Sequence, residues 1–334
     1  MEAKEGNIVA KERQRLDKVL PLRTPYTIAI DPCNLCNFKC NFCAMQVNEE
    51  IVPYKKCIMS MELFTKIIDD ISCFEDKLKV LRINGQGEPL LNRNFSKMVK
   101  YAKQKGVADW IETITNGSML EPMINKELVD SGIDRIRISI EALDAEGYRN
   151  IAGVQVDIDK MIHNIEDLYK RSRGKMEIYI KTVNVSEETE KKRKQFYEMF
   201  GNICAQIFEY NVIPLWSDFD KLNKTYSINK EVGVHGQVVK NVDICPYPFY
   251  SFIINADGEV TLCCADWKRR IVIGDARKQS VVDIWNSEEY KHFLKKMLAQ
   301  KRQSFDMCKK CLLPVYDCND NIDEQAKVLL EKYQ

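Results

Sequence analysis

The sequence predicts an α/β fold whose main part is a partial, TIM-like (β/α)6 barrel. Six short, β-branched apolar runs recur between residues 26 and 213, and stretches with apolar residues at helical spacing separate them. Strands that alternate with helices are joined by right-handed crossovers, so the sheet should be parallel. Because cysteines cluster again near the end of the chain, a small cysteine-rich domain is expected to follow the barrel.

The expected strands are rich in Ile, Val, Thr and Tyr. They span residues 27–30, 79–84, 110–115, 136–141, 177–183 and 205–212. Helical spacing is found in residues 63–71, 95–102 and 158–169. Ser60 is placed to cap the first helix, and Gly106 and Gly132 follow the ends of the second and third. Ligands are expected at the carboxyl ends of the strands, where parallel barrels bind them.

The chain divides into four parts by composition. Residues 1–23 form a charged N-terminal extension, and residues 24–215 hold the barrel pattern. A polar connector at 216–244 leads to the cysteine-rich unit at 245–334. A chain of 334 residues is long enough for both units to bury a core.

The charge balance argues against polyanionic partners. Fifty basic and 49 acidic residues leave a net charge of +1, so no nucleic-acid or anionic-membrane surface is expected. The chain has no apolar run of about eighteen residues, so no membrane-spanning helix is predicted. No apolar signal segment opens the chain, and we therefore expect a soluble protein of the reducing cytoplasm.

Three cysteines, Cys36, Cys40 and Cys43, follow the first expected strand as Cys-x3-Cys-x2-Cys. Three thiolates can hold a four-iron cluster by three corners and leave the fourth iron open to a substrate or cosubstrate. A structural zinc site is the alternative, but it needs four ligands, and Cys33 could complete that set.

This run, with the aromatic Phe42 just before the last cysteine, resembles the signature of the radical S-adenosylmethionine enzymes, and the resemblance extends from about residue 24 onward. It implies a catalytic [4Fe-4S] cluster at Cys36, Cys40 and Cys43, with Phe42 near the cofactors. It also implies reductive cleavage of S-adenosylmethionine to methionine and a 5'-deoxyadenosyl radical, which takes a hydrogen atom from the substrate. A flavodoxin or ferredoxin is the implied electron donor.

A Gly-Gln-Gly-Glu-Pro run at 85–89 follows the second expected strand. Its glycines let the backbone approach a ligand closely, and the carboxylate beside them can receive an ammonium group. Gly-Glu-Pro is also an ordinary turn. The resemblance implies that Gly87 and Glu88 hold the methionine amino group of the cosubstrate, whereas Gln86 departs from the family's glycine and leaves Gly85 without a role.

Polar residues also end the third, fourth and fifth strands. Asn116, Ser139 and Glu141 are suitable partners for a methionine carboxylate or a ribose, although such residues are common at loop entries too. The family resemblance implies that Ser139 meets the ribose, and Asn116 is a further cofactor-binding candidate. Lys181 on the fifth strand could contact cosubstrate or substrate, with a solvated surface lysine as the alternative.

A second constellation comprises Cys245, Cys263, Cys308 and Cys311. Four thiolates from separated segments can fully ligate a four-iron cluster, and a zinc ribbon is the alternative. The flanking runs at 254–260, 263–266 and 273–275 resemble the SPASM and twitch extensions of radical enzymes, which hold auxiliary [4Fe-4S] clusters.

A full SPASM extension has seven cysteines and two clusters. This chain adds only Cys264 and Cys318 at less regular spacing, so one auxiliary cluster is predicted. This is the twitch arrangement, and the spacing is similar to that of the 2-deoxy-scyllo-inosamine dehydrogenase type of enzyme.

The leading functional hypothesis is oxidation of a sugar-like or aminocyclitol alcohol in a biosynthetic pathway, since a fully ligated cluster is a suitable electron acceptor. Modification of a ribosomal peptide, as by maturases of the SPASM group, is the main alternative. About two dozen residues precede the first strand, too few for a separate leader-binding core, which favours a small molecule. A radical epimerase, or a non-catalytic zinc or electron-transfer protein, are further alternatives.

Overall fold

A computed structural model of the chain describes residues 4–5, 14–46, 54–184, 189–213, 231–317 and 320–333. Its strands form one sheet in the order β1-β7-β6-β5-β4-β3-β2-β8-β9-β10. The strands are β1 Lys4–Glu5, β2 Thr27–Ile30, β3 Leu78–Arg82, β4 Ala108–Thr115, β5 Arg135–Ile140, β6 Glu177–Asn184, β7 Gln206–Asn211, β8 Ser251–Ile254, β9 Glu259–Thr261 and β10 Val272–Asp275.

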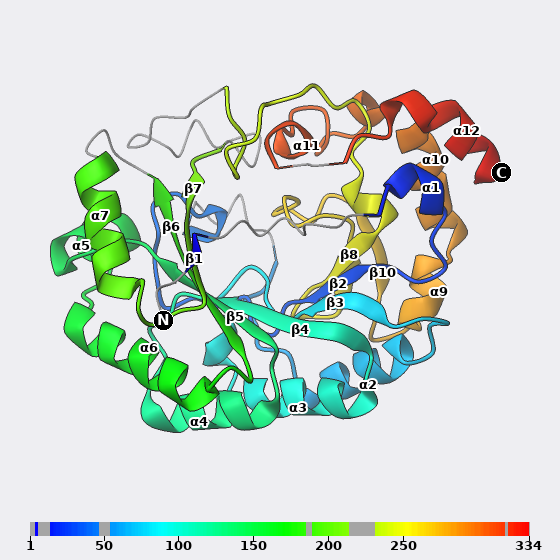
Figure 1. Cartoon of the computed structure of the whole chain (residues 1–334). Helices are drawn as coiled ribbons and strands as arrows, with labels where there is room; N and C mark the ends of the chain where they lie inside the picture. The colour runs from blue at the N-terminus through cyan, green and yellow to red at the C-terminus, as the bar shows by residue number, and fades with distance from the viewer. Residues whose placement is uncertain are drawn as a thin grey trace.

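Strands β2 to β7 are the six predicted strands, and each pairs in parallel with the next. Their ends agree with the predicted ranges to within two residues. The curved sheet is open at one side, which confirms the predicted partial barrel (Figure 1). Parallel pairing brings the carboxyl ends of these strands to one edge, where the ligands of such barrels bind.

Helices on the chain between the strands cover the outer face of the sheet (Figure 1). They are α2 Met61–Ile71, α3 Phe95–Lys105, α4 Pro122–Ser131, α5 Ala145–Ala152, α6 Ile158–Ser172 and α7 Thr189–Phe200. The predicted helix ends are confirmed. Ser60 caps the start of α2, because the backbone N–H of Leu63 donates to Ser60 Oγ at 3.1 Å. Gly106 and Gly132 end α3 and α4 with φ of 63° and 79°, a backbone conformation that glycine adopts without steric cost.

The strands have one apolar face and one face with charged residues. Leu81, Ile111 and Ile136 are at most 1% exposed and belong to the main hydrophobic core. Successive side chains of a strand point to opposite faces, so the intervening residues Arg82, Glu112 and Arg137 point away from the helices. We call the space inside the curve of β2 to β7 the lumen.

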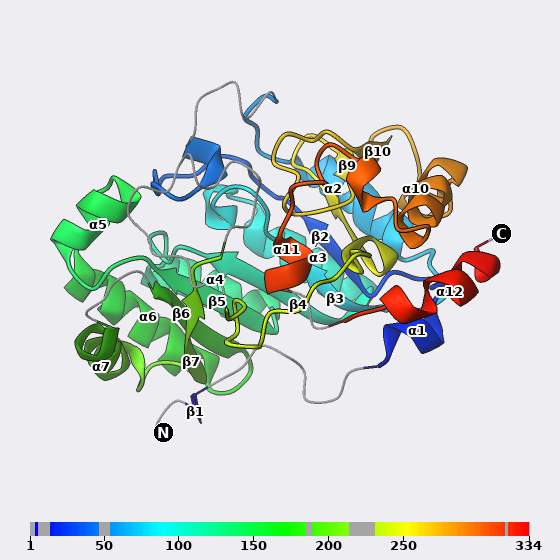
Figure 2. The same ribbon diagram turned by 90° about the horizontal axis from the view of Figure 1, so that it is seen from above.

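The C-terminal region continues the barrel sheet. β8 pairs in parallel with β2, from Thr27 beside Ser251 to Ile30 beside Ile254, and β9 and β10 follow as antiparallel strands. The remaining helices are α1 Leu16–Val19, α9 Val281–Trp285, α10 Glu288–Leu298, α11 Leu313–Tyr316 and α12 Ala326–Lys332. Seen from above, α10, β9 and β10 lie at one end of the sheet, and α11 lies over the strands (Figure 2).

Ser287 caps α10 and separates it from α9, so the helical stretch predicted around 285–297 is two helices. The predicted connector at 216–244 and the N-terminal extension at 1–23 lie partly outside the described residues, and the four domain boundaries remain predictions. None of the helices in the described ranges is both long and apolar enough to cross a membrane.

Candidate active site

The loop that carries Cys36, Cys40 and Cys43 leaves the carboxyl end of β2. Backbone hydrogen bonds attach it to the end of α5: Lys39 N–H donates to Ala152 O at 2.7 Å, and Asn41 N–H donates to Ile151 O at 2.9 Å. All three cysteines are partly buried. The loop is therefore held at the mouth of the barrel, where the sequence predicted it.

The three thiols lie close to one another. Burial raises the pKa of Cys40, and Glu141, Cys43 and Cys36 raise it further in that order. Cys33 does not join them, because it is fully buried and its thiol donates to Leu35 O at 3.6 Å.

Within the described parts of the chain, no three His, Cys, Asp or Glu side chains converge as ligands of a single metal ion would. A four-iron cluster takes one thiolate per iron and so tolerates wider spacing than zinc, whose ligands all meet one ion. With Cys33 held elsewhere, the loop offers three thiolates, one fewer than structural zinc needs and as many as a four-iron cluster with one open iron takes.

The 85–89 run packs directly on the cysteine loop. The backbone N–H of Glu88 donates to Leu35 O at 2.8 Å. A Cβ atom on Gly87 would lie 2.2 Å from Leu35 O and 2.3 Å from Cys33 O, so a side chain at this position would separate the two loops. Sequence reasoning left Gly85 without a role. A Cβ atom on Gly85 would lie 2.3 Å from Asp31 Cγ, so this glycine also packs closely against its neighbour. Both glycines permit a close approach of backbone.

The Glu88 carboxylate is 2% exposed and accepts three hydrogen bonds within the protein. Thr115 Oγ1 donates at 2.7 Å, Asn116 N–H at 2.8 Å and Leu90 N–H at 3.0 Å. Burial raises the pKa of Glu88, and these donors lower it by less. A carboxylate has about four acceptor positions, so one remains for a ligand ammonium. Glu88 thus shapes the turn and keeps the capacity predicted for it.

Asn116 connects β4 to the cysteine loop. Its Nδ2 donates to Asn37 Oδ1 at 3.0 Å and lies 3.9 Å from Cys36 Sγ. Ser139 is 9% exposed and stands beside Lys181 in the β5–β6 register. Among the residues described, the Ser139 hydroxyl has no hydrogen-bond partner. Phe42, in the cysteine loop, is partly buried. The structure brings Glu88 and Asn116 to the cysteines, with Ser139 at the same edge of the sheet.

Sequence reasoning missed a charged network in the lumen. Glu112 of β4 accepts from Arg82 Nε at 2.8 Å, from Arg137 Nη2 at 2.8 and 2.9 Å, and from Arg135 Nη1 at 3.2 Å. Burial alone would raise the pKa of Glu112, but the three guanidinium groups lower it to about 2. Charged residues at alternate positions of apolar strands were the signal that could have revealed this network.

Lys181 also lies in the lumen and not on the solvated surface. Its Nζ is 5.2 Å from the centre of the Tyr210 ring. Burial lowers the pKa of Lys181, and Glu141 raises it by less. The cation–π contact and the carboxylate of Glu141 offset part of the lost hydration of this ammonium group.

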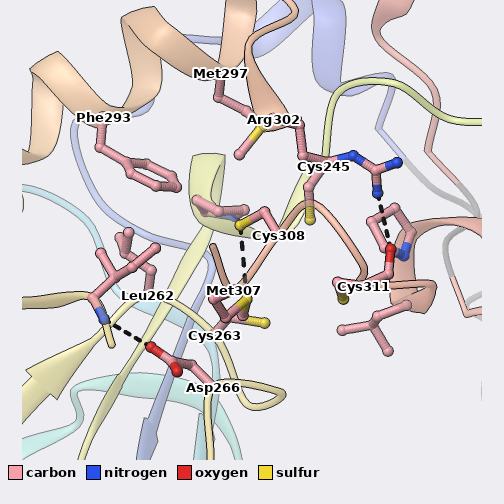
Figure 3. A pocket seen from close by; sticks show the side chains of 14 residues that line it. Cys245, Leu262, Cys263, Asp266, Phe293, Met297, Arg302, Met307, Cys308 and Cys311 are labelled. Carbon is pink, nitrogen blue, oxygen red and sulfur yellow. Dashed lines mark hydrogen bonds between the residues drawn. The ribbon is translucent and has the colours of Figure 1, made fainter. Parts of the chain in front are cut away.

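The second set of cysteines lines one cavity (Figure 3). Its members are Cys245 before the 3-10 helix Tyr247–Phe249, Cys263 after β9, and Cys308 and Cys311 before α11. In Figure 3 their sulfur atoms face a common space that also receives apolar side chains. These apolar neighbours are Leu262, Phe293, Met297 and Met307. Three separate segments of chain thus build this cavity.

Polar groups hold the loops of this cavity in place. Arg302 Nη1 donates to Cys311 O at 3.1 Å, and Asp266 accepts from the N–H groups of Arg270 and Ile271 at 3.0 and 2.9 Å. Cys264 is exposed and does not line the cavity, and Cys318 lies outside the described residues. Four protein ligands with an apolar surround fit a fully ligated iron-sulfur cluster.

An open parallel barrel with three cysteines at its mouth, and a separate cavity with four, defines the class as a barrel enzyme with iron-sulfur centres. The chain belongs to the radical SAM superfamily, whose sequence profile matches residues 30–200. A second profile, the SPASM iron-sulfur cluster-binding domain, matches residues 245–312. Membership implies a [4Fe-4S] cluster, S-adenosylmethionine and auxiliary iron-sulfur binding, which confirms the predicted cofactors.

Curated relatives match along different lengths. The chain is 26% identical over 316 residues to the tungsten-containing aldehyde ferredoxin oxidoreductase cofactor-modifying protein of Pyrococcus furiosus, covering 83% of this chain and 85% of that one. It is 34% identical over 133 residues to a probable GTP 3',8-cyclase of Methanococcus maripaludis, covering 38% of this chain and 42% of the relative. The second match spans less than half of the cyclase.

Solved structures share the fold. The crystal structure of BtrN in complex with AdoMet and 2-DOIA aligns with a TM-score of 0.55 at 17% identity, covering 86% of this chain and 92% of BtrN. Streptococcus suis SuiB bound to precursor peptide SuiA aligns with a TM-score of 0.62 at 15% identity, covering 84% of this chain and 69% of SuiB. At these identities the likeness concerns the fold alone.

Proposed function

We propose that this radical SAM enzyme is an oxidoreductase that dehydrogenates an alcohol group of a small, sugar-like or aminocyclitol substrate. The observation that carries the proposal is the enclosed cavity of Cys245, Cys263, Cys308 and Cys311, next to a barrel whose mouth holds a separate set of three cysteines. A cluster with four protein ligands has no open iron for a substrate but can accept an electron.

Cys36, Cys40 and Cys43 would hold the catalytic cluster and leave one iron for S-adenosylmethionine. When bound, these cofactors supply a 5'-deoxyadenosyl radical that abstracts hydrogen from carbon. Glu88 would receive the methionine ammonium at its remaining acceptor position, and Asn116 would keep its β4 loop against the cysteines. Ser139 offers a hydroxyl for the ribose. Gly87 keeps the two loops in contact.

Dehydrogenation of an alcohol removes two electrons and two protons. The abstracted hydrogen atom accounts for one of each, so a second electron needs an acceptor and a second proton must leave the hydroxyl. The four-cysteine cavity would hold one auxiliary cluster in this acceptor role, as the spacing predicted. Phe293, Met297 and Met307 give this cavity a mostly apolar lining.

The fold likeness to BtrN, solved with AdoMet and 2-DOIA, supports a small ring substrate. The Pyrococcus furiosus relative, which is named for modifying a cofactor and matches over 85% of its length, also supports a small molecule. A flavodoxin or ferredoxin would supply the electron that starts each turnover.

Peptide modification is the second candidate, because the fold also aligns with SuiB bound to its precursor peptide. The two candidates differ in what the lumen must accommodate. A peptide enters as an extended chain with neutral backbone, whereas the lumen here is lined by Arg82, Arg137, Glu112 and Lys181. These charges favour a small polar molecule.

The test is an anaerobic assay of the reconstituted protein with S-adenosylmethionine and a chemical reductant. Formation of 5'-deoxyadenosine and methionine is expected, and an aminocyclitol substrate should yield a product lighter by two hydrogens. Chromatography with mass detection measures all three. Cleavage that is stimulated by peptides and not by polyols would transfer the assignment to the peptide-modifying group, and absence of any cleavage would refute both.

A further inference from the structure

We propose that Arg82 binds an anionic oxygen group of the substrate, a phosphate or a carboxylate, inside the lumen. The inference rests on the proposed function, since it takes the lumen as the substrate cavity, and it adds the chemical class of the molecule that enters. Arg82 is the last residue of β3, at the carboxyl-end edge where the ligands of a parallel barrel bind.

The first observation is the partly used guanidinium of Arg82. Its Nε donates to Glu112 Oε1 at 2.8 Å, and 41% of its side chain is exposed. Among the residues that the structure describes, neither terminal nitrogen of Arg82 has a hydrogen-bond partner. Two parallel N–H donors on one guanidinium match the oxygens of a carboxylate or a phosphate, so this free end suits a bidentate anion.

The second observation is that Glu112 is fully occupied. Both of its oxygens also accept from Arg137, Arg135 donates to one of them, and the side chain is 1% exposed. Arg135 in turn pairs with Glu177 at 2.8 Å. Arg82 therefore shares the Glu112 carboxylate with two other guanidinium groups and has no carboxylate of its own among its ion pairs. The exposed end of Arg82 is hydrated, and a ligand anion that displaces this water would form a charged, bidentate pair with the guanidinium.

The third observation is the direction in which Arg82 faces. Burial lowers its pKa, but Glu112, Tyr250 and Tyr247 raise it above the ordinary value, which places its guanidinium near two tyrosines that precede β8. Burial raises the pKa of Tyr210 to about 12, against the opposing effect of Arg137 and Arg82. Together with its hydrogen bond to Glu112, these effects indicate that the Arg82 guanidinium lies on the lumen side of β3.

A carboxylate and an ammonium group within electrostatic reach of the same tyrosine bear on the choice of ligand. Asp317 accepts from the Tyr247 hydroxyl at 2.7 Å, and its carboxylate acts together with Arg82 on Tyr210 and Cys264. Among the described residues no hydrogen bond joins Asp317 to Arg82, so the terminal nitrogens of Arg82 stay open to a ligand. Lys181 is also next to the Tyr210 ring, and the Glu141 carboxylate acts on its ammonium group. A neutral polyol could hydrogen-bond to Arg82, but it would form no ion pair with the guanidinium.

The test is calorimetric titration of inorganic phosphate, and separately of succinate, into reconstituted holoenzyme with saturating S-adenosylmethionine. Saturable binding of at least one anion at millimolar concentration is expected, and Arg82→Gln should weaken it about tenfold or more through loss of a charged bidentate pair. The amide can still contact Glu112, which keeps Arg135 and Arg137, so the fold should persist. Circular dichroism and iron content check this. Arg23→Gln, at a surface arginine that is 80% exposed, is the matched control.

Tighter binding of phosphate indicates a phosphoester substrate, and tighter binding of succinate indicates a carboxylate. Equal binding by the wild type and a folded Arg82→Gln variant overturns the proposal, as does absence of saturable binding of both anions by the wild type. Because binding is read without turnover, it is independent of the cleavage assay. A failed cleavage assay would therefore remove the proposed function without deciding whether Arg82 binds an anion.

Discussion

The two cysteine sites are built in opposite ways. Cys36, Cys40 and Cys43 come from one short loop at the open mouth of the barrel, among polar partners such as Glu88 and Asn116. The four cysteines of the second site come from three separated segments and face an apolar, enclosed cavity (Figure 3). A site that must receive a substrate needs access and hydrogen-bonding groups, whereas a site that stores an electron benefits from complete ligation and exclusion of water.

The largest expected effect separates the two sites by iron content. Two four-iron clusters predict about eight irons per chain. Replacing Cys36, Cys40 and Cys43 together by alanine should leave about half of the iron and abolish cleavage of S-adenosylmethionine. Cys73→Ala, at an exposed cysteine outside both sites, should keep the full iron content and activity. If the triple variant cleaves S-adenosylmethionine at the full rate, these three cysteines do not hold the cluster with the open iron.

Removal of the second site tests the electron-acceptor role. Cys308→Ala with Cys311→Ala should leave reductive cleavage of S-adenosylmethionine largely intact, while formation of the oxidised product fails. Circular dichroism must accompany the assay, because lost ligands can also unfold a metal-dependent unit. A folded double variant that forms oxidised product at the native rate would contradict the acceptor role and favour a redox-neutral reaction such as epimerisation.

A third prediction concerns the lumen between the two sites. Glu112→Gln leaves three buried or half-buried guanidinium groups without their carboxylate, so the free energy of unfolding at neutral pH should fall by about 3–5 kcal/mol. Denaturant titration followed by circular dichroism measures the change. Glu75→Gln, which breaks the exposed pair with Arg23, should change it by less than about 1 kcal/mol.

The same variant has a pH signature. The pKa of Glu112 is about 2 in the folded protein against an ordinary value of 4.5, so the folded state binds fewer protons than the unfolded state between these values. The contribution of Glu112 to stability is therefore complete above pH 4.5 and is lost as the pH falls toward 2. The difference between wild type and Glu112→Gln should shrink over that range, and a constant difference would show that the network does not depend on this charge.

The smallest expected effect concerns the cosubstrate. Glu88→Gln removes the charge that would pair with the methionine ammonium, so the affinity for S-adenosylmethionine should weaken by roughly 1.5–3 kcal/mol while the iron stays. Thr115→Val removes one protein donor to the same carboxylate but leaves its charge, and should weaken binding less. Equilibrium binding measures the affinity of both variants for S-adenosylmethionine. If the two variants lose the same affinity, Glu88 only shapes the turn.

Local patterns were sufficient to predict the barrel. Strand and helix periodicity, the Ser60 cap and the glycine stops depend on neighbours within a few residues, and the structure agrees with them. The division of residues 281–298 into α9 and α10 was missed, although Ser287 is a usual capping residue.

Residues that act through tertiary contacts were harder to predict. Spacing identified the cysteines because metal ligands must follow short, fixed intervals. Arg82, Glu112 and Arg137 lie on three different strands, and their mutual contacts depend on the register of β3, β4 and β5. Gly85 and Gly87 were noted as flexible backbone, but their packing against Asp31 and Leu35 depends on how two loops meet. Neither register nor loop packing can be read from local sequence.

The parallel pairing of β8 with β2 has a consequence for how the chain can be divided. β2 would otherwise be a bare edge strand of the barrel, with its N–H and C=O groups exposed along Thr27 to Ile30. Unprotected edges of this kind pair with other molecules and lead to aggregation. A barrel expressed without the C-terminal unit should therefore self-associate. The C-terminal unit thus covers the edge of β2 in addition to providing the second cysteine site.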